Sequence, residues 1–125
     1  MSSTYSTTLR LELIGNGDQS GTWGDTTNTN LGTALEEAIT GSADVTFASG
    51  TVTLTLTDTN TSQTARNLRL NLIGTSGGAR NLTVPAIKKY YIITNGLADT
   101  VTVKNPTGTN TYTIPAGRTA QVFST

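Results

Sequence analysis

Few side chains in this sequence can support catalysis. Its 125 residues include no histidine and no cysteine, so a Ser-His-Asp or Cys-His arrangement, a thiolate metal site and a disulfide are all excluded. Glycoside hydrolysis needs two carboxyl groups facing each other across a bond, and only folding could bring such a pair together here. Several acids occupy expected turns or the wet face of an expected helix. We therefore expect no enzyme and no catalytic residue among the eight carboxylates, which are Glu12, Asp18, Asp25, Glu36, Glu37, Asp44, Asp58 and Asp99.

Two polar segments are partly similar to ligand-binding loops. Gly15-Asn16-Gly17 and Gly21 are spaced almost like a dinucleotide fingerprint, but the third glycine is one position late and the expected helix starts about ten residues further on. Asp58-Thr59-Asn60 begins like a calcium loop and lacks its glycine and its distal glutamate. We therefore expect turns at both segments, with no cofactor and no metal.

The composition indicates a β-protein with a neutral, polar surface. Only 34% of the residues are hydrophobic, 13% are charged, and about 28 are threonines, which suit pleated, half-exposed strands. The formal net charge is zero, so the basic face of a nucleic-acid-binding protein is missing. Apolar runs fall far short of the roughly 20 residues of a membrane span, and the start lacks the features of a signal peptide. We expect no nucleic-acid partner, no membrane insertion, and synthesis in a cytosol.

The first part of the chain predicts a strand, an ordered loop and a short helix. Apolar and polar side chains alternate from Leu9 to Leu13, as in a half-buried strand. The helix is expected to follow Asn30 as its N-cap and to end before Gly41 as its C′ residue. At about nine residues it is too short to be stable alone, so it must pack on the sheet or on a neighbouring chain. Its apolar face is formed by Leu31, Ala34, Leu35, Ala38 and Ile39.

Residues 43–125 read as a series of strands. Apolar residues alternate with threonines over 51–57, Tyr90 to Thr94 is an almost unbroken apolar run that predicts a central strand, and Pro115-Ala116-Gly117 predicts a tight turn between the last two strands. Short strands spaced about 10–15 residues apart favour a sandwich or barrel. We expect a mainly β fold, an antiparallel, jelly-roll-like β-sandwich with one short N-terminal helix. Residues 1–42 would form an attachment or oligomerisation segment and 43–125 the sandwich, within a single structural domain.

The aromatic residues have alternative interpretations. Trp23 lies in the expected loop between Gly21 and Gly24, where it either fills a pocket in the chain's own core or anchors an interface, where tryptophan is enriched. With the helix residues Leu31, Leu35 and Ile39, it makes the candidate interface. Tyr90 and Tyr112 either pack within the sheets or stack on sugars, which makes them candidate glycan contacts.

Several segments resemble a domain found at the amino terminus of tailed-phage tail fibres and related virion appendages. The most distinctive is Gly21-Thr22-Trp23-Gly24, which is followed by Thr29-Asn30-Leu31-Gly32, by the two Ala-Arg-Asn-Leu segments at 65–68 and 79–82, and by Ile114-Pro115-Ala116-Gly117. The similarity covers nearly the whole chain, although the alternating strands are generic. It implies a homotrimer, since fibres of this kind usually have three chains.

The resemblance also implies a role: a non-enzymatic structural protein of a bacteriophage virion, acting as a tail fibre attachment or adaptor module. Two alternatives stay open, a capsid decoration (cement) or head-fibre protein, and a receptor- or carbohydrate-binding tip for host attachment. The expected partners are further copies of the chain, other phage tail or capsid proteins and, for a tip, a host surface glycan. The expected location is the virion, after synthesis in the host cytoplasm, and appendage chains commonly continue beyond a position such as Thr125.

Overall fold

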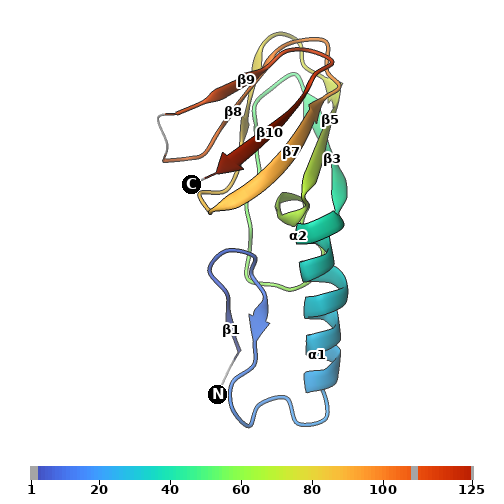
Figure 1. Ribbon diagram of the computed structural model, residues 1–125, viewed down its shortest axis with the longest axis vertical. Helices are drawn as coiled ribbons and strands as arrows, with labels where there is room; N and C mark the ends of the chain where they lie inside the picture. The colour runs from blue at the N-terminus through green and yellow to red at the C-terminus, as the bar shows by residue number, and fades with distance from the viewer. Residues whose placement is uncertain (1–2, 108–109, 125) are drawn as a thin grey trace.

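A helical arm and a body of two β-sheets make up this chain. The computed structural model describes residues 3–107 and 110–124. Figure 1 shows the body at one end and the arm extending from it, with the N-terminal hairpin beside the helix. The expectation of a mainly β fold with one helix is confirmed, because strands predominate and residues 23–40 form one continuous helix.

The arm contains a small hairpin and a helix that is longer than the sequence pattern predicts. β1 (Thr4–Tyr5) pairs antiparallel with β2 (Glu12–Leu13). The helix then runs without interruption through α1 (Trp23–Thr29), the π-helical η1 (Asn30–Leu35) and α2 (Glu36–Thr40). The predicted start at Asn30 is therefore wrong, since Thr22 is the N-cap.

The early start of the helix has a physical reason that the apolar pattern does not contain. The first turns pack through hydrogen bonds: the Asn30 side chain accepts a bond from Glu12 N at 2.9 Å and donates one to Glu12 O at 2.8 Å. The Gln19 side chain donates to Glu12 Oε2 at 2.7 Å and accepts a bond from the Thr26 hydroxyl. A helix face that packs on polar groups leaves no hydrophobic periodicity to detect. Trp23 consequently lies in the helix rather than in the predicted loop.

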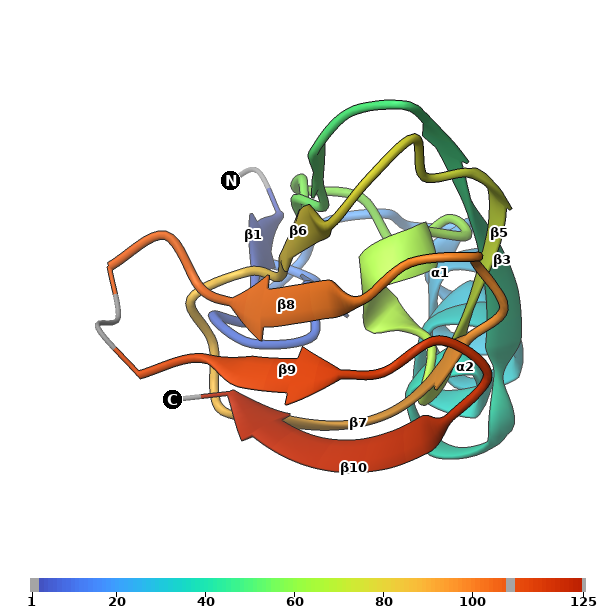
Figure 2. The ribbon, with the colours of Figure 1, turned by 90° about the horizontal axis from the view of Figure 1, so that it is seen from above.

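The body consists of two four-stranded sheets, as far as the described residues show. One sheet has the order β10-β7-β5-β3 and the other β4-β6-β8-β9. The chain alternates between the sheets up to β8, then β9 adds to the second sheet beside β8 and β10 returns to the first sheet beside β7 (Figure 2). The strands are β3 (Ser42–Ala48), β4 (Val52–Thr53), β5 (Arg69–Thr75), β6 (Arg80–Thr83), β7 (Lys89–Asn95), β8 (Val101–Lys104), β9 (Tyr112–Ile114) and β10 (Thr119–Ser124).

Strand direction corrects the predicted antiparallel, jelly-roll-like sandwich. β3–β5, β5–β7, β4–β6 and β6–β8 are parallel pairs, and only β7–β10 and β8–β9 are antiparallel within the two sheets. Successive strands of one sheet run in the same direction because each is followed by an excursion through the other sheet. Alternating side chains reveal which face of a strand is buried but not the direction of its neighbour.

The core lies between the two sheets. In the register of the first sheet, Val45 aligns with Leu72, and Leu70 aligns with Ile93. All four side chains are buried, and they join eight more apolar residues in one cluster: Phe47, Leu82, Val84, Tyr91, Leu97, Val101, Val103 and Ile114.

Individual strand predictions have mixed outcomes. The predicted central strand is confirmed, because β7 lies between β5 and β10, and so is the turn at 115–117, which Arg118 N closes on Pro115 O at 3.2 Å. The long strands expected at 51–57 and from Leu9 to Leu13 reduce to the short β4 and β2. A 3-10 turn, η2 (Thr64–Arg66), precedes β5.

Candidate interaction surfaces

The helix leaves large apolar side chains uncovered. Trp23, Leu31 and Ile39 are 61%, 55% and 60% exposed, and Leu35 is half-buried. In Figure 1 the β1–β2 hairpin lies on one side of the helix, and no ribbon lies beside its opposite side. We call these four residues the helix face. Within this chain Trp23 is no core plug, so the interpretation as an interface anchor is the one that stays open.

The π-helical segment explains why three of these residues form a row. In an α-helix of 3.6 residues per turn, positions four apart drift around the axis by about 40° at each step. The wider i→i+5 turns of a π-helix reduce this drift. Leu31 and Leu35 lie within η1 and Ile39 follows in α2, so their four-residue spacing keeps them near one line. The inner side of the same segment carries the buried Ala34.

A buried arginine fixes the arm to the body. The Arg66 side chain is completely buried and donates to the backbone carbonyls of Leu9 at 2.8 Å, Thr59 at 2.7 Å and Thr61 at 2.6 Å. It also forms an ion pair with Glu37 of the helix, with 3.2 Å between Nη1 and Oε1. A buried guanidinium is tolerated when its donors are satisfied in this way. The N-terminal hairpin, the helix and the 59–61 segment therefore all meet at the side chain of Arg66, which belongs to η2.

A second buried cation lies near this junction. Lys89 Nζ donates to the carbonyls of Asn67 and Tyr90, each at 3.3 Å, and lies 4.4 Å from the centre of the Tyr91 ring. Burial lowers the pKa of Lys89 to about 8. The Tyr91 hydroxyl donates to Ala65 O at 2.6 Å, and burial raises the pKa of that hydroxyl. Because Lys89 is only 6% exposed, it supports the structure rather than meeting a substrate.

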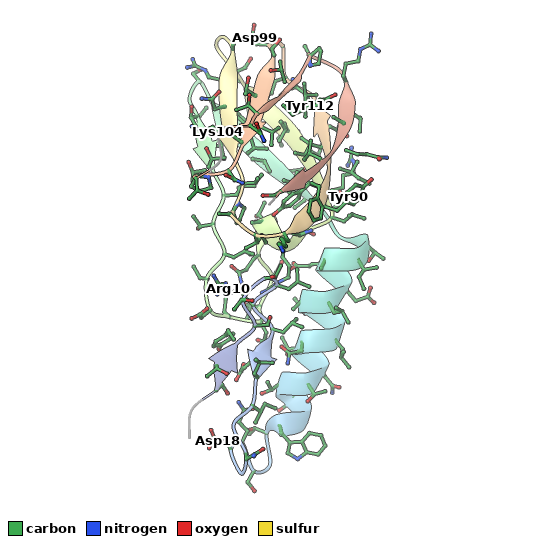
Figure 3. The ribbon with its side chains drawn as sticks, turned by 60° about the vertical axis from the view of Figure 1, so that its left-hand side comes forward. Arg10, Asp18, Tyr90, Asp99, Lys104 and Tyr112 are labelled. Atoms are coloured by element: carbon green, nitrogen blue, oxygen red, sulfur yellow. The ribbon has the colours of Figure 1, made fainter. Side chains whose placement is uncertain are left out.

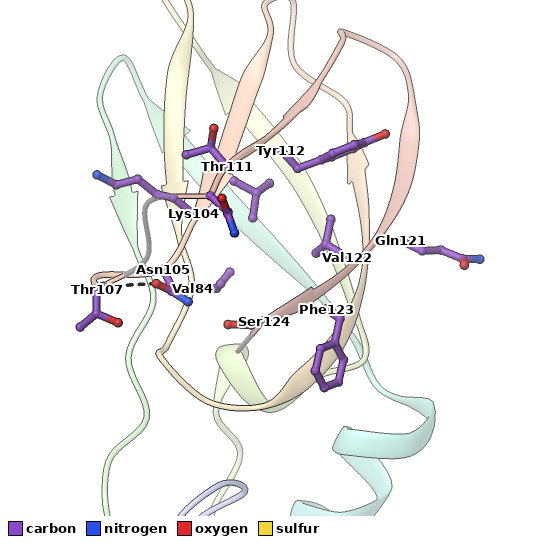
Figure 4. Close-up of a pocket in the computed structure, with 12 residues that line it drawn as sticks. Val84, Lys104, Asn105, Thr107, Thr111, Tyr112, Gln121, Val122, Phe123 and Ser124 are labelled. Atoms are coloured by element: carbon purple, nitrogen blue, oxygen red, sulfur yellow. Dashed lines mark hydrogen bonds between the residues drawn. The ribbon is translucent and has the colours of Figure 1, made fainter.

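A hollow of the body opens between the ends of the two sheets. It has a volume of about 680 Å³ and lies where β8 and β9 diverge from the end of β10. We call it the mouth hollow (Figure 4). Tyr112, 54% exposed, stands on its rim. Its lining is Val84, Val103, Lys104, Asn105, Thr107, Asn110, Thr111, Tyr112, Gln121, Val122, Phe123 and Ser124.

A smaller hollow of about 410 Å³ lies where the arm meets the body. We call it the arm hollow. Its lining includes Leu9, Ile39, Tyr90 and Phe123. The structure thus brings the predicted interface residue Ile39 together with Tyr90, one of the two predicted glycan contacts, and separates Tyr90 from Tyr112.

The carboxylates lie in several parts of the molecule. Asp18 and Asp99 lie at opposite ends of the molecule (Figure 3). Asp99 accepts hydrogen bonds from Ser76 Oγ at 2.7 Å and Gly78 N at 2.9 Å, and these bonds lower its pKa. No group of three His, Cys, Asp or Glu residues suited to a metal ion occurs in the described ranges.

Both loop-like motifs serve as turns. Gly17 and Gly21 adopt positive φ angles of 79° and 86°, which glycine tolerates without strain, and Asp18 N donates to Gly15 O at 2.9 Å. In the calcium-like segment Asp58 pairs with Arg10 at 3.5 Å.

The sequence analysis missed Phe123 as a residue of these surfaces. Phe123 is 62% exposed and lines both hollows. Phe123 could have been noticed as a large apolar residue on the polar side of an alternating strand, since Ala120 and Val122 take the inner positions. The sequence analysis singled out Arg66 only within the Ala-Arg-Asn-Leu segment at 65–68, and its buried position was not predicted, because most of its partners are backbone carbonyls.

Comparisons with known proteins give no match: no family model, no curated protein and no solved structure is similar to this chain. Within the described part, no helix is long and apolar enough to cross a membrane.

Proposed function

We propose that this chain is a non-enzymatic structural module of a phage virion, a tail fibre attachment or adaptor domain that assembles as a homotrimer. The observation that carries the proposal is the uncovered helix face of Trp23, Leu31, Leu35 and Ile39. Fully burying one leucine or isoleucine side chain stabilises by roughly 1.5–3 kcal/mol. Several such residues per chain therefore provide a driving force for association.

The charge distribution favours further copies of the same chain as the partner. The formal net charge is zero, so copies do not repel one another at long range. In a parallel trimer, three helices place their equivalent Leu31, Leu35 and Ile39 side chains at the same height around one axis, as in a coiled coil.

The rigid connection of arm and body also supports an assembly role. Because Arg66 ties Leu9, Glu37 and the 59–61 segment together, the helix cannot fold back to cover its own apolar face without breaking buried hydrogen bonds. The face is therefore presented outward in a fixed orientation, which lowers the entropy that association must overcome.

The resemblance to tail fibre domains supports the virion assignment. The residues that carry it include Trp23 and Leu31, which belong to the helix face, and Arg66, which fixes the arm. A threonine-rich, weakly charged surface suits a protein that stays outside cells in an assembled particle.

Sedimentation equilibrium tests the oligomeric state. We expect the unmodified chain to have three times the 13.0 kDa mass of one copy, and a Leu31→Ser, Ile39→Ser double variant to have the mass of a monomer. Leu13→Ser is the matched control, since Leu13 is 50% exposed on β2 outside the helix, and it should leave the trimer intact. A monomeric unmodified chain at about 100 µM, a concentration far above a micromolar Kd, would contradict the proposal.

Particle assembly tests the virion role. We expect Trp23→Ala to abolish incorporation of the chain into phage particles, because it removes the largest side chain of the helix face. A normal amount of this variant in purified virions would argue against the interface. The number of copies of the chain per particle then distinguishes a tail location from a capsid location. A handful to tens of copies indicates a tail part, and hundreds indicate a capsid cement protein.

A further inference from the structure

The mouth hollow combines an apolar floor with a polar rim. Val84 and Val103 are buried and Val122 is half-buried, and these three side chains form the floor. Figure 4 shows Asn105 and Ser124 beside them and Tyr112 on the upper rim, while Lys104 and Gln121 extend outward on opposite sides. A concave site at the open end of a β-structure, with a few polar groups around an apolar floor, is the usual form of a small-molecule site.

The size of the hollow suits a ligand rather than a few waters. Its volume of about 680 Å³ falls within the roughly 300–1,000 Å³ of ligand pockets. The opening arises from the fold itself, because β9 begins and β10 ends there without pairing to each other. None of its lining residues belongs to the helix face.

The lining restricts the chemistry of the ligand. Among its residues are three side-chain amides and three hydroxyl-bearing residues besides Tyr112, one cation and no carboxylate. Amides and hydroxyls both donate and accept hydrogen bonds, whereas a phosphate would favour several cations or a helix N-terminus. With no carboxylate, histidine or cysteine in the lining, the site can hold a molecule but has no group to cleave it or to bind a metal.

Some of these groups are held in position before a ligand arrives. The Asn105 carbonyl accepts a bond from Thr107 N at 3.2 Å, and the Ser124 hydroxyl donates to Pro85 O at 3.1 Å. Tyr112 belongs to β9, where it pairs with Val103 of β8, so its backbone is fixed while its ring stays accessible. Preorganised groups lower the entropic cost of binding.

We infer that the mouth hollow is a binding site for a neutral saccharide. The ring of Tyr112 would pack on the apolar face of a sugar ring, and the amides of Asn105 and Asn110 would bond its hydroxyl groups. The inference does not depend on the trimer, because every residue that it uses belongs to one chain and lies outside the helix face.

Titration of the isotopically labelled chain with three saccharides tests the inference by NMR. The probes are maltotriose, triacetylchitotriose and 3′-sialyllactose, each up to about 10 mM, a range that detects millimolar Kd values. We expect at least one of the two neutral probes to shift the amide signals of Asn105, Tyr112 and Val122. Absence of shifts with both neutral probes overturns the inference. Binding of sialyllactose alone would show that the ligand is a charged saccharide and would also overturn it.

Two tyrosine variants then locate the site. Tyr112→Ala should weaken binding at least about tenfold, as loss of an aromatic hot-spot contact does. Tyr90→Ala is the matched control, because Tyr90 is 40% exposed and lines the arm hollow, and its affinity should remain within about twofold, a change well below that of a hot-spot residue. Equal affinity of both variants, with signals showing that both are folded, would place the saccharide elsewhere and overturn the inference.

Discussion

In the β body, twelve buried apolar side chains from both sheets meet in one core, whereas in the helix Trp23–Thr40 only Ala34 is buried. The body is therefore stabilised mainly by the hydrophobic effect. The arm is held by specific hydrogen bonds, from Asn30 to Glu12 and from Arg66 to Leu9. Because polar contacts attach the arm to the body, the arm can keep large apolar side chains on its outside.

The largest effect is expected at the junction of the two regions. Arg66→Met should lower the free energy of unfolding by about 3–5 kcal/mol, because it leaves Glu37 and three or more buried carbonyls without their donor. Chemical denaturation followed by circular dichroism measures this change. Arg69→Met is the control, since Arg69 is half-buried and its side chain donates to the hydroxyls of Ser42 and Thr94. An equal decrease in the free energy of unfolding for both variants would show that Arg66 contributes no more to stability than a half-buried surface arginine.

A matched pair of isoleucines compares the two regions directly. Ile93 is completely buried and Ile39 is 60% exposed. Ile93→Ala should lower the free energy of unfolding by roughly 2–5 kcal/mol through lost burial and a cavity. Ile39→Ala should change the stability of the monomer by less than about 0.5 kcal/mol and should weaken self-association instead. Denaturation of the dissociated chain, together with sedimentation, separates these effects. A large monomer destabilisation by Ile39→Ala would mean that the helix face is part of the chain's own core.

The buried lysine makes the stability of the body depend on pH. Burial lowers the pKa of Lys89 from 10.5 to about 8, so between pH 8 and about 10 the unfolded state binds more protons than the folded state, and stability rises with pH. We expect an increase on the order of 1–2 kcal/mol. Above pH 10 the raised pKa of Tyr91 acts in the opposite direction, because the unfolded tyrosine then loses its proton first.

Urea denaturation at pH 7, 8, 9 and 9.5 measures this rise. Lys89→Met should flatten the pH profile, because it removes the titrating amine, while Lys88→Met, a change at the exposed neighbour, should preserve it. A profile that stays steep in the Lys89 variant would assign the pH dependence to another group.

The smallest change in stability is expected for an alanine substitution at a glycine of the arm, which is compared with the same substitution at a glycine of the body. Gly24 lies in α1, and a Cβ there would meet no atom within 4 Å. Gly24→Ala should therefore raise the free energy of unfolding by roughly 0.5–1 kcal/mol, the difference in helix propensity. Gly74→Ala is the opposite case: its φ is +101° and the added Cβ would lie 2.4 Å from Phe47 O, so stability should fall. Thermal denaturation of both variants checks the two signs, and a destabilising Gly24→Ala would contradict the open setting of α1.

The sequence predicted the body better than the arm. Leu70 and Leu72 on β5, and Tyr91 and Ile93 on β7, alternate with half-buried or exposed residues, so hydrophobic patterning placed these strands. The first turns of the helix escaped detection because Thr26 and Asn30 pack through hydrogen bonds. The arrangement of the strands also escaped detection. Ala43 aligns with Leu70, 27 positions later, and Leu70 aligns with Ile93, 23 positions later. Because these two spacings differ, the sequence shows no regular repeat.

The candidate surfaces were predictable only in part. Leu31, Leu35 and Ile39 were identified by their spacing, and the structure adds that two of them are more than half exposed. Tyr90 and Tyr112 were grouped by residue type, and the structure separates them into two hollows. The separation of Tyr90 from Tyr112 depends on how β7 and β9 are placed in the two sheets, which residue type does not reveal.

The sequence by itself determined that strands predominate, that one helix carries an apolar row, and that no histidine or cysteine chemistry is possible, because these properties follow from residue types and local spacing. Only the tertiary structure decided the parallel direction of the strands, the burial of Arg66 and the opening of the mouth hollow beside Tyr112. Each of these depends on contacts between segments far apart in the chain, such as the 57 positions that separate Arg66 from Leu9. Local pattern does not encode such contacts, whereas packing of the whole chain selects them.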